Sequence, residues 1–123
     1  MLNRLRVHRV SFRHAYEGFL YTIKSQPNFR FHLIATVLVI LLGLYYQIST
    51  FEWLVIIFTI NMVLVAEMVN TSIESMVDLI TLERREDAKR AKDVSAGLVL
   101  VSAVLAVAIG LLIFLPKIAL GLS

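Results

Sequence analysis

Four polar side chains recur along one face of a predicted helix whose other residues are mostly apolar. On a helix that turns 100° per residue, a stripe about 80° wide contains Glu67, Asn70, Glu74 and Asp78. A carboxylate inside a membrane helix is energetically costly, and it usually marks a functional site. Three carboxyl groups and one amide in a row suit a proton acceptor placed beside a site for a hard cation.

Each of these side chains also has a purely structural interpretation. Glu67 could be a neutral carboxyl group that is hydrogen-bonded to a neighbouring helix, or it could be a general base in an apolar setting. Glu74 and Asp78 could form a solvated face where the helix leaves the membrane, or they could bind a divalent cation. Asn70 could join two helices, but its alignment with the carboxylates favours a role in a site.

The composition indicates an integral membrane protein. Hydrophobic residues make up 59% of the 123 residues, and they are concentrated in long runs. A soluble domain averages about 45–50% apolar residues. There is no cysteine, which excludes disulfides and thiolate metal sites. The sequence predicts an all-α integral membrane protein with one small domain over residues 1–123.

The helices that must position the polar row can be placed from the hydrophobic runs. We expect an amphipathic surface helix over residues 1–27, membrane spans over 28–46, 51–80 and 94–115, and a charged cytoplasmic loop over 81–93. Pro27 breaks the chain between the surface helix and the first span. Asp93 is the expected N-cap of the third span. The second span is longer than the membrane is thick, which places Glu74 and Asp78 at its cytoplasmic edge.

The basic residues set the orientation. Six of the twelve Lys and Arg residues precede Phe31, five lie in the 81–93 loop, and Lys117 is the last. The positive-inside rule therefore places the N-terminus and this loop in the cytoplasm. Because the basic groups cluster beside membrane spans, their distribution argues against nucleic acid as a partner.

Phosphoryl transfer is the reaction that best suits a carboxylate and cation site at the cytoplasmic face. The sequence contains no Gly-rich phosphate loop or Walker pattern, so side chains and metal would have to hold a nucleotide. A small proton-coupled transporter that uses Glu67 as a relay is the alternative, although transport carboxylates are expected near the midplane. A non-enzymatic scaffold would leave the polar row unexplained.

The residues also resemble a known family. The motif Glu67-x-x-Asn70-Thr71-x-Ile73-Glu74-x-x-Val77-Asp78, followed by Ala91-Lys92-Asp93, resembles the prokaryotic diacylglycerol kinases, which include the undecaprenol kinases of Gram-positive bacteria. The resemblance extends over nearly the whole chain, from Phe12-Arg13-His14-Ala15 through Asn28-Phe29-Arg30-x-His32 to the third span.

The resemblance implies a homotrimer in the bacterial inner membrane that transfers the γ-phosphate of ATP to a lipid alcohol with the help of Mg²⁺. By position in the motif, Glu67 would be the catalytic base and Glu74 a Mg²⁺ ligand. The residues that would line or cover the nucleotide are Asn70, Asp78, Lys92, Asp93, Arg13 and Glu17.

One position departs from the family pattern. Many members carry a Glu, which shares the metal, at the position that Gln26 occupies here. An amide oxygen can coordinate Mg²⁺ but brings no charge, so Gln26 is expected to be a weaker second ligand. The segments around Phe12 and Asn28 resemble the Gram-positive branch, which favours undecaprenol as the substrate, with diacylglycerol as the second candidate.

Overall fold

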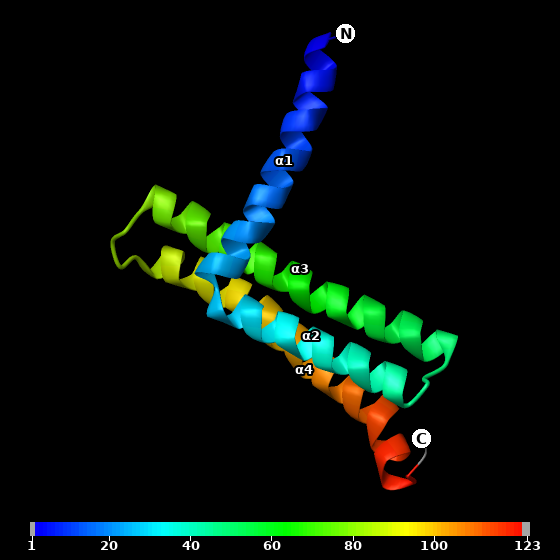
Figure 1. Ribbon diagram of the computed structural model, residues 1–123. Helices are drawn as coiled ribbons and strands as arrows, with labels where there is room; N and C mark the ends of the chain where they lie inside the picture. Colours follow the sequence, from blue (N-terminus) through cyan, green and yellow to red (C-terminus); the bar gives the residue numbers. More distant parts are fainter. Residues whose placement is uncertain (1, 122–123) are drawn as a thin grey trace.

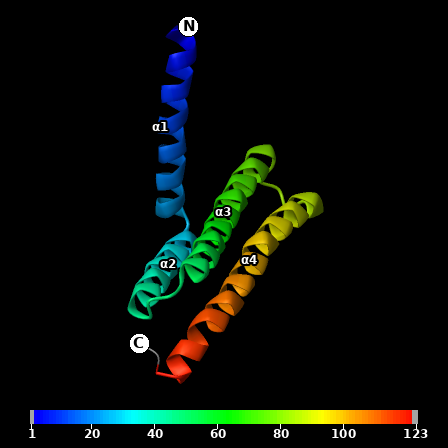
Figure 2. The same cartoon turned by 90° about the vertical axis from the view of Figure 1, so that its right-hand side faces the viewer.

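The computed structural model contains four α-helices, and it describes the backbone of residues 2–121 and the side-chain surroundings of residues 11–121. The helices are α1 (Leu2–Ser25), α2 (Pro27–Tyr45), α3 (Thr50–Ile80) and α4 (Glu86–Ala119). Helices α2, α3 and α4 lie side by side as a bundle, and α1 projects away from it (Figures 1 and 2). The all-α prediction is therefore confirmed.

The three bundled helices are each long and apolar enough to cross a membrane. Their outward faces carry large apolar side chains that are exposed within the single chain, including Leu38, Phe58 and Leu112. An apolar surface of this extent requires lipid or other protein around it. The expected integral membrane class is confirmed, while the homotrimer stays a prediction.

Helix α1 ends where the sequence predicts a break. Gln26 adopts an extended conformation with φ −113° and ψ 104°, and Pro27 occupies the first turn of α2, where its missing N–H is not needed. The ring of Phe19 packs edge-on against the buried Phe29 at 5.7 Å between centroids. In Figure 1, α1 runs steeply across the direction of the bundle, which suits a helix that lies along a membrane surface. Leu2, Leu5 and Val10, which belong to the apolar face predicted for the surface helix, lie outside the described side chains.

The far end of the bundle is fixed by a short turn and one cross-helix ion pair. Ser49 caps α3, its hydroxyl accepting from the Glu52 N–H while the Glu52 carboxylate accepts from the Ser49 N–H. The other carboxylate oxygen of Glu52 accepts from Lys117 of α4 at 2.9 Å. Gly43 leaves room for Trp53, because a Cβ at this position would lie 2.6 Å from the indole ring. These contacts fix α2, α3 and α4 relative to one another at the end of the bundle opposite Asp78.

The third span begins earlier than the sequence analysis predicted. Helix α4 starts at Glu86 rather than at Val94, so the connection is only Thr81–Arg85 and Asp93 is not an N-cap. Its first turn carries Glu86 and Asp87, which are favourable near the positive end of the helix dipole. Arg90 lies one turn further on and pairs with Glu86 at 3.7 Å. The charged stretch is therefore mostly a helical extension at the N-terminal end of the third span.

Candidate functional site

Glu67 is buried between helices. Only 2% of its surface is exposed, and its carboxylate faces α2, where the His32 Nε2 atom lies 3.3 Å from Glu67 Oε1. Among the described residues, Oε1 has no aligned hydrogen-bond donor. A carboxylate in this position is shielded from bulk water, which would suit a general base.

Asn70 lies one turn nearer the C-terminal end of α3, and it faces α4 rather than α2. Its amide oxygen accepts a hydrogen bond from the hydroxyl of the fully buried Ser95 at 2.7 Å. The same hydroxyl lies 2.9 Å from the carbonyl oxygen of Lys92, so its single proton is shared between two acceptors. The Asn70 amide nitrogen donates to Glu74 at 3.3 Å, which orients that carboxylate.

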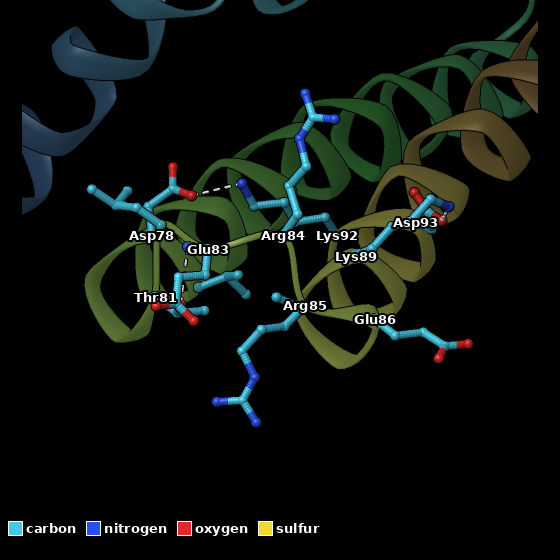
Figure 3. Close-up of a pocket in the computed structure, with 12 residues that line it drawn as sticks. Asp78, Thr81, Glu83, Arg84, Arg85, Glu86, Lys89, Lys92 and Asp93 are labelled. Atoms are coloured by element: carbon cyan, nitrogen blue, oxygen red, sulfur yellow. Dashed lines mark hydrogen bonds and ion pairs between the residues drawn. The ribbon is translucent and has the colours of Figure 1, made fainter.

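Asp78 closes the row at the C-terminal end of α3. Its carboxylate accepts from the Lys92 ammonium at 2.6 Å, and both side chains are partly exposed (Figure 3). Lys92 is thereby held between α3 and α4 with its charge beside the row. Asp78 and Lys92 together join the end of the second span to the first turns of the third.

An open cavity of about 670 Å³ lies beside this pair, between the end of α3, the Thr81–Arg85 turn and the first turns of α4. Its charged lining residues are four acidic and four basic side chains: Asp78, Glu83, Glu86 and Asp93, and Arg84, Arg85, Lys89 and Lys92 (Figure 3). Small-molecule sites span about 300–1,000 Å³, so its size suits a nucleotide. Lys92 is the cation that links the cavity to the polar row.

Two of the predicted nucleotide residues lie on α1. Arg13 and Glu17 pair with each other at 2.8 Å, and both are well exposed. Hydrogen bonds from Arg13, and then from His14, lower the pKa of Glu17 below its ordinary value. Because that pKa is lowered, the pairing is present at neutral pH and is lost as the pH falls through it. Within the described side chains, these contacts stay on α1 and do not reach the row.

The predicted metal residues are not brought together as a complete ligand set. Among the residues that the structure describes, no three His, Asp or Glu side chains form a group that could hold a metal ion. Glu74 is half-buried and shares one oxygen with Asn70. The described hydrogen bonds of Gln26 are made by its backbone, to Thr22 and from Arg30. Asp93 pairs with Lys89 on its own helix.

The sequence analysis missed the partners that hold the row. His32 and Ser95 were not singled out as site residues, yet they provide the contacts to Glu67 and Asn70. A signal for His32 was present, because Phe29, His32, Thr36, Val39 and Gly43 repeat at three- and four-residue spacing. That spacing defines the face of α2 that packs inward.

Comparison with known proteins is consistent with this geometry. A family model described as prokaryotic diacylglycerol kinase matches residues 13–114, which include every member of the polar row. An undecaprenol kinase from Bacillus subtilis is 45% identical over 107 residues, covering 87% of this chain and 87% of that protein.

Two diacylglycerol kinases are also similar to the chain. The protein from Synechocystis is 39% identical over 108 residues, covering 87% of this chain and 62% of its own length. The protein from Escherichia coli K12 is 28% identical over 83 residues, covering 68% of each chain.

The buried Ser95 hydroxyl generates a first prediction. Replacing Ser95 with Ala leaves the amide oxygen of Asn70 without its donor, which should lower the free energy of unfolding by about 1–3 kcal/mol. Thermal unfolding in detergent micelles measures this loss. Ser102→Ala, which removes a half-buried hydroxyl from the same helix, is the matched control. Equal stability of the two variants would contradict a structural role for the Ser95–Asn70 bond.

Proposed function

We propose that this chain, which belongs to the prokaryotic diacylglycerol kinase family and is a lipid kinase, transfers the γ-phosphate of ATP to undecaprenol at the cytoplasmic face of the cell membrane. The observation that carries the choice of lipid is the similarity to the undecaprenol kinase, at 45% identity over 87% of both chains. The diacylglycerol kinases match at 39% and 28% identity. Diacylglycerol is therefore the second candidate substrate.

Glu67 is the proposed general base. Its carboxylate takes the proton of the lipid hydroxyl while the hydroxyl oxygen forms a bond to the γ-phosphorus and the bond to ADP breaks. The burial of Glu67 supports this role, because a shielded base meets a membrane alcohol without competition from bulk water. Its place just past the midpoint of α3, two turns before Glu74, lets a lipid and a cytosolic nucleotide meet there.

The nucleotide is proposed to bind at the cytoplasmic end of the row. Lys92 supplies a positive charge next to the cavity, and Asp78 holds it in place at 2.6 Å. Phosphates need such charge, since little covalent chemistry is required of the protein. Asn70 and Asp93 line the same region in this proposal, and Arg13 and Glu17 cover the nucleotide from α1.

A magnesium ion is proposed to bind with the nucleotide rather than in a site made by protein alone. Mg²⁺ typically binds through one or two carboxylates plus substrate phosphates, and it keeps several waters. Glu74 fits such a partial ligand set, because one of its carboxylate oxygens accepts a hydrogen bond from Asn70 and the other can bind the ion. Gln26 is the proposed weaker second ligand. When bound, the ion neutralises phosphate charge, while Asn70 keeps the Glu74 carboxylate oriented.

The assembly and orientation are proposals as well. A homotrimer would cover part of the apolar surface that the single chain exposes, and it could add residues from α1 to a neighbouring site. The basic residues at the N-terminus and in the 81–93 region favour a cytoplasmic location for both. Family membership favours the kinase over the transporter that the sequence analysis kept as an alternative.

The substrate proposal is tested by measuring transfer of labelled γ-phosphate from Mg-ATP in mixed micelles. Undecaprenol and diacylglycerol are offered separately to the purified protein at equal surface concentration. We expect product with both lipids and a higher kcat/KM for undecaprenol. A higher kcat/KM for diacylglycerol would reverse the order of the two substrates, and transfer to neither by a folded protein would contradict the proposed reaction.

The metal proposal predicts opposite effects at two positions. Glu74→Ala should raise the Mg²⁺ concentration needed for half-maximal rate at least about tenfold or abolish activity, because a charged ligand is lost. Gln26→Glu should lower that concentration, because it adds a carboxylate. Asp87→Ala, which removes an exposed carboxylate from α4, is the control. A Glu74→Ala variant with the Mg²⁺ requirement of the control would remove Glu74 as a ligand.

A further inference from the structure

His32 is the residue of α2 that reaches the buried carboxylate of α3. Its Nε2 atom lies 3.3 Å from Glu67 Oε1, and the two side chains are 16% and 2% exposed. Among the described side chains, no other hydrogen bond or ion pair joins α2 to α3. It is therefore a specific link between the first span and the proposed base.

The chemistry of the pair explains why it matters. A buried carboxylate without a donor or counter-charge is strongly unfavourable. Within the described part of the chain, Oε1 has no other donor, and the nearest charge on the same helix is the carboxylate of Glu74, which repels it. The His32 N–H is close enough to donate but is not aligned in this arrangement, so a small rotation of either side chain completes the bond.

The other side of the His32 ring faces mostly apolar side chains. The ring borders a small hollow of about 90 Å³ between α2, α3 and α4, whose lining is mostly apolar and includes Ala35, Val39 and Ile60. The hydroxyl of Thr36 also borders the hollow, and it donates a hydrogen bond to the His32 carbonyl oxygen at 2.8 Å. Water is thus a poor replacement for the imidazole on this side, and Glu67 depends on His32 itself.

We propose that His32 is a positioning residue for the phosphoryl transfer. Its Nε2–H donates to Glu67 Oε1, which fixes the carboxylate between α2 and α3 and turns Oε2 toward the lipid hydroxyl. This inference rests on the proposed role of Glu67 as the base. His32 takes no proton from the substrate in this account; it determines where the accepting oxygen stands.

The test replaces His32 with Gln, Asn or Leu, whose side chains differ in length and in whether they carry an N–H donor. In Gln the amide nitrogen lies close to the position of His Nε2, whereas in Asn it is one bond too short, and Leu has no donor. We expect His32→Leu and His32→Asn to lower kcat at least about tenfold, since a misplaced catalytic group can cost up to about a hundredfold. His32→Gln should keep kcat within about threefold of the unmodified protein, and the KM for Mg-ATP should change less than about twofold throughout, because the nucleotide is held elsewhere.

Two controls separate this role from packing and from failure of the base assignment. Thr36→Val alters the same face of α2 without touching Glu67 and should leave kcat unchanged. Thermal unfolding and oligomer size are measured for each variant, and the comparison of Gln with Asn stands even where His32→Leu fails to fold. Equal kcat for His32→Gln and His32→Asn, or full kcat in His32→Leu, would overturn the proposal. If Glu67→Gln, assayed in parallel, also keeps full turnover, the base assignment itself is wrong.

Discussion

The whole structure depends on finding partners for a row of polar side chains in an apolar helix. Glu67 faces His32 of α2, and Asn70 is bonded to Ser95 of α4. Asp78 pairs with Lys92, also of α4. Without these partners, the buried Glu67 and the half-buried Asn70 would oppose packing within the membrane, because buried polar atoms need donors or counter-charges. The helices around α3 are therefore positioned by chemistry as well as by apolar contact.

The row is also graded in its exposure to water. Glu67 is 2% exposed, Asn70 and Glu74 are half-buried, and Asp78 is exposed beside the cavity at the α3–α4 turn. This gradient runs along about three turns of one helix, so the proposed proton acceptor Glu67 and the wet end of the row, where Asp78 holds Lys92 of α4, are spaced by one rigid element. A lipid alcohol and a nucleotide, which differ completely in solubility, can be brought together on such a helix.

The features fixed by local pattern were predictable from sequence. The spans near 28–46 and 51–80 follow from apolar runs and from Pro27, and the alignment of Glu67 with Asn70 follows from helical geometry. The start of α4 was not predicted, because charged residues from Glu86 onward form good helix as readily as loop. Asp93 was consequently misassigned as a cap.

The partners of the row were harder to predict than the row itself. His32 and Ser95 acquire their importance only when α2 and α4 pack on α3, which is information about tertiary packing rather than about period or propensity. Whether Arg13, Glu17 and Gln26 lie near the row also depends on tertiary packing, which the sequence pattern does not reveal. The family resemblance supplied expectations for these positions that the packing within one chain does not reproduce.

The central claim is that Glu67, held dry on α3, accepts the proton of the lipid alcohol. The most direct measurement is the single-turnover rate of γ-phosphate transfer by Glu67→Gln, with Mg-ATP binding measured on the same sample. Gln keeps the size of the side chain but cannot accept the proton, so the account predicts a loss of at least about a hundredfold in rate, with nucleotide binding retained. Transfer at the rate of the unmodified protein would contradict it.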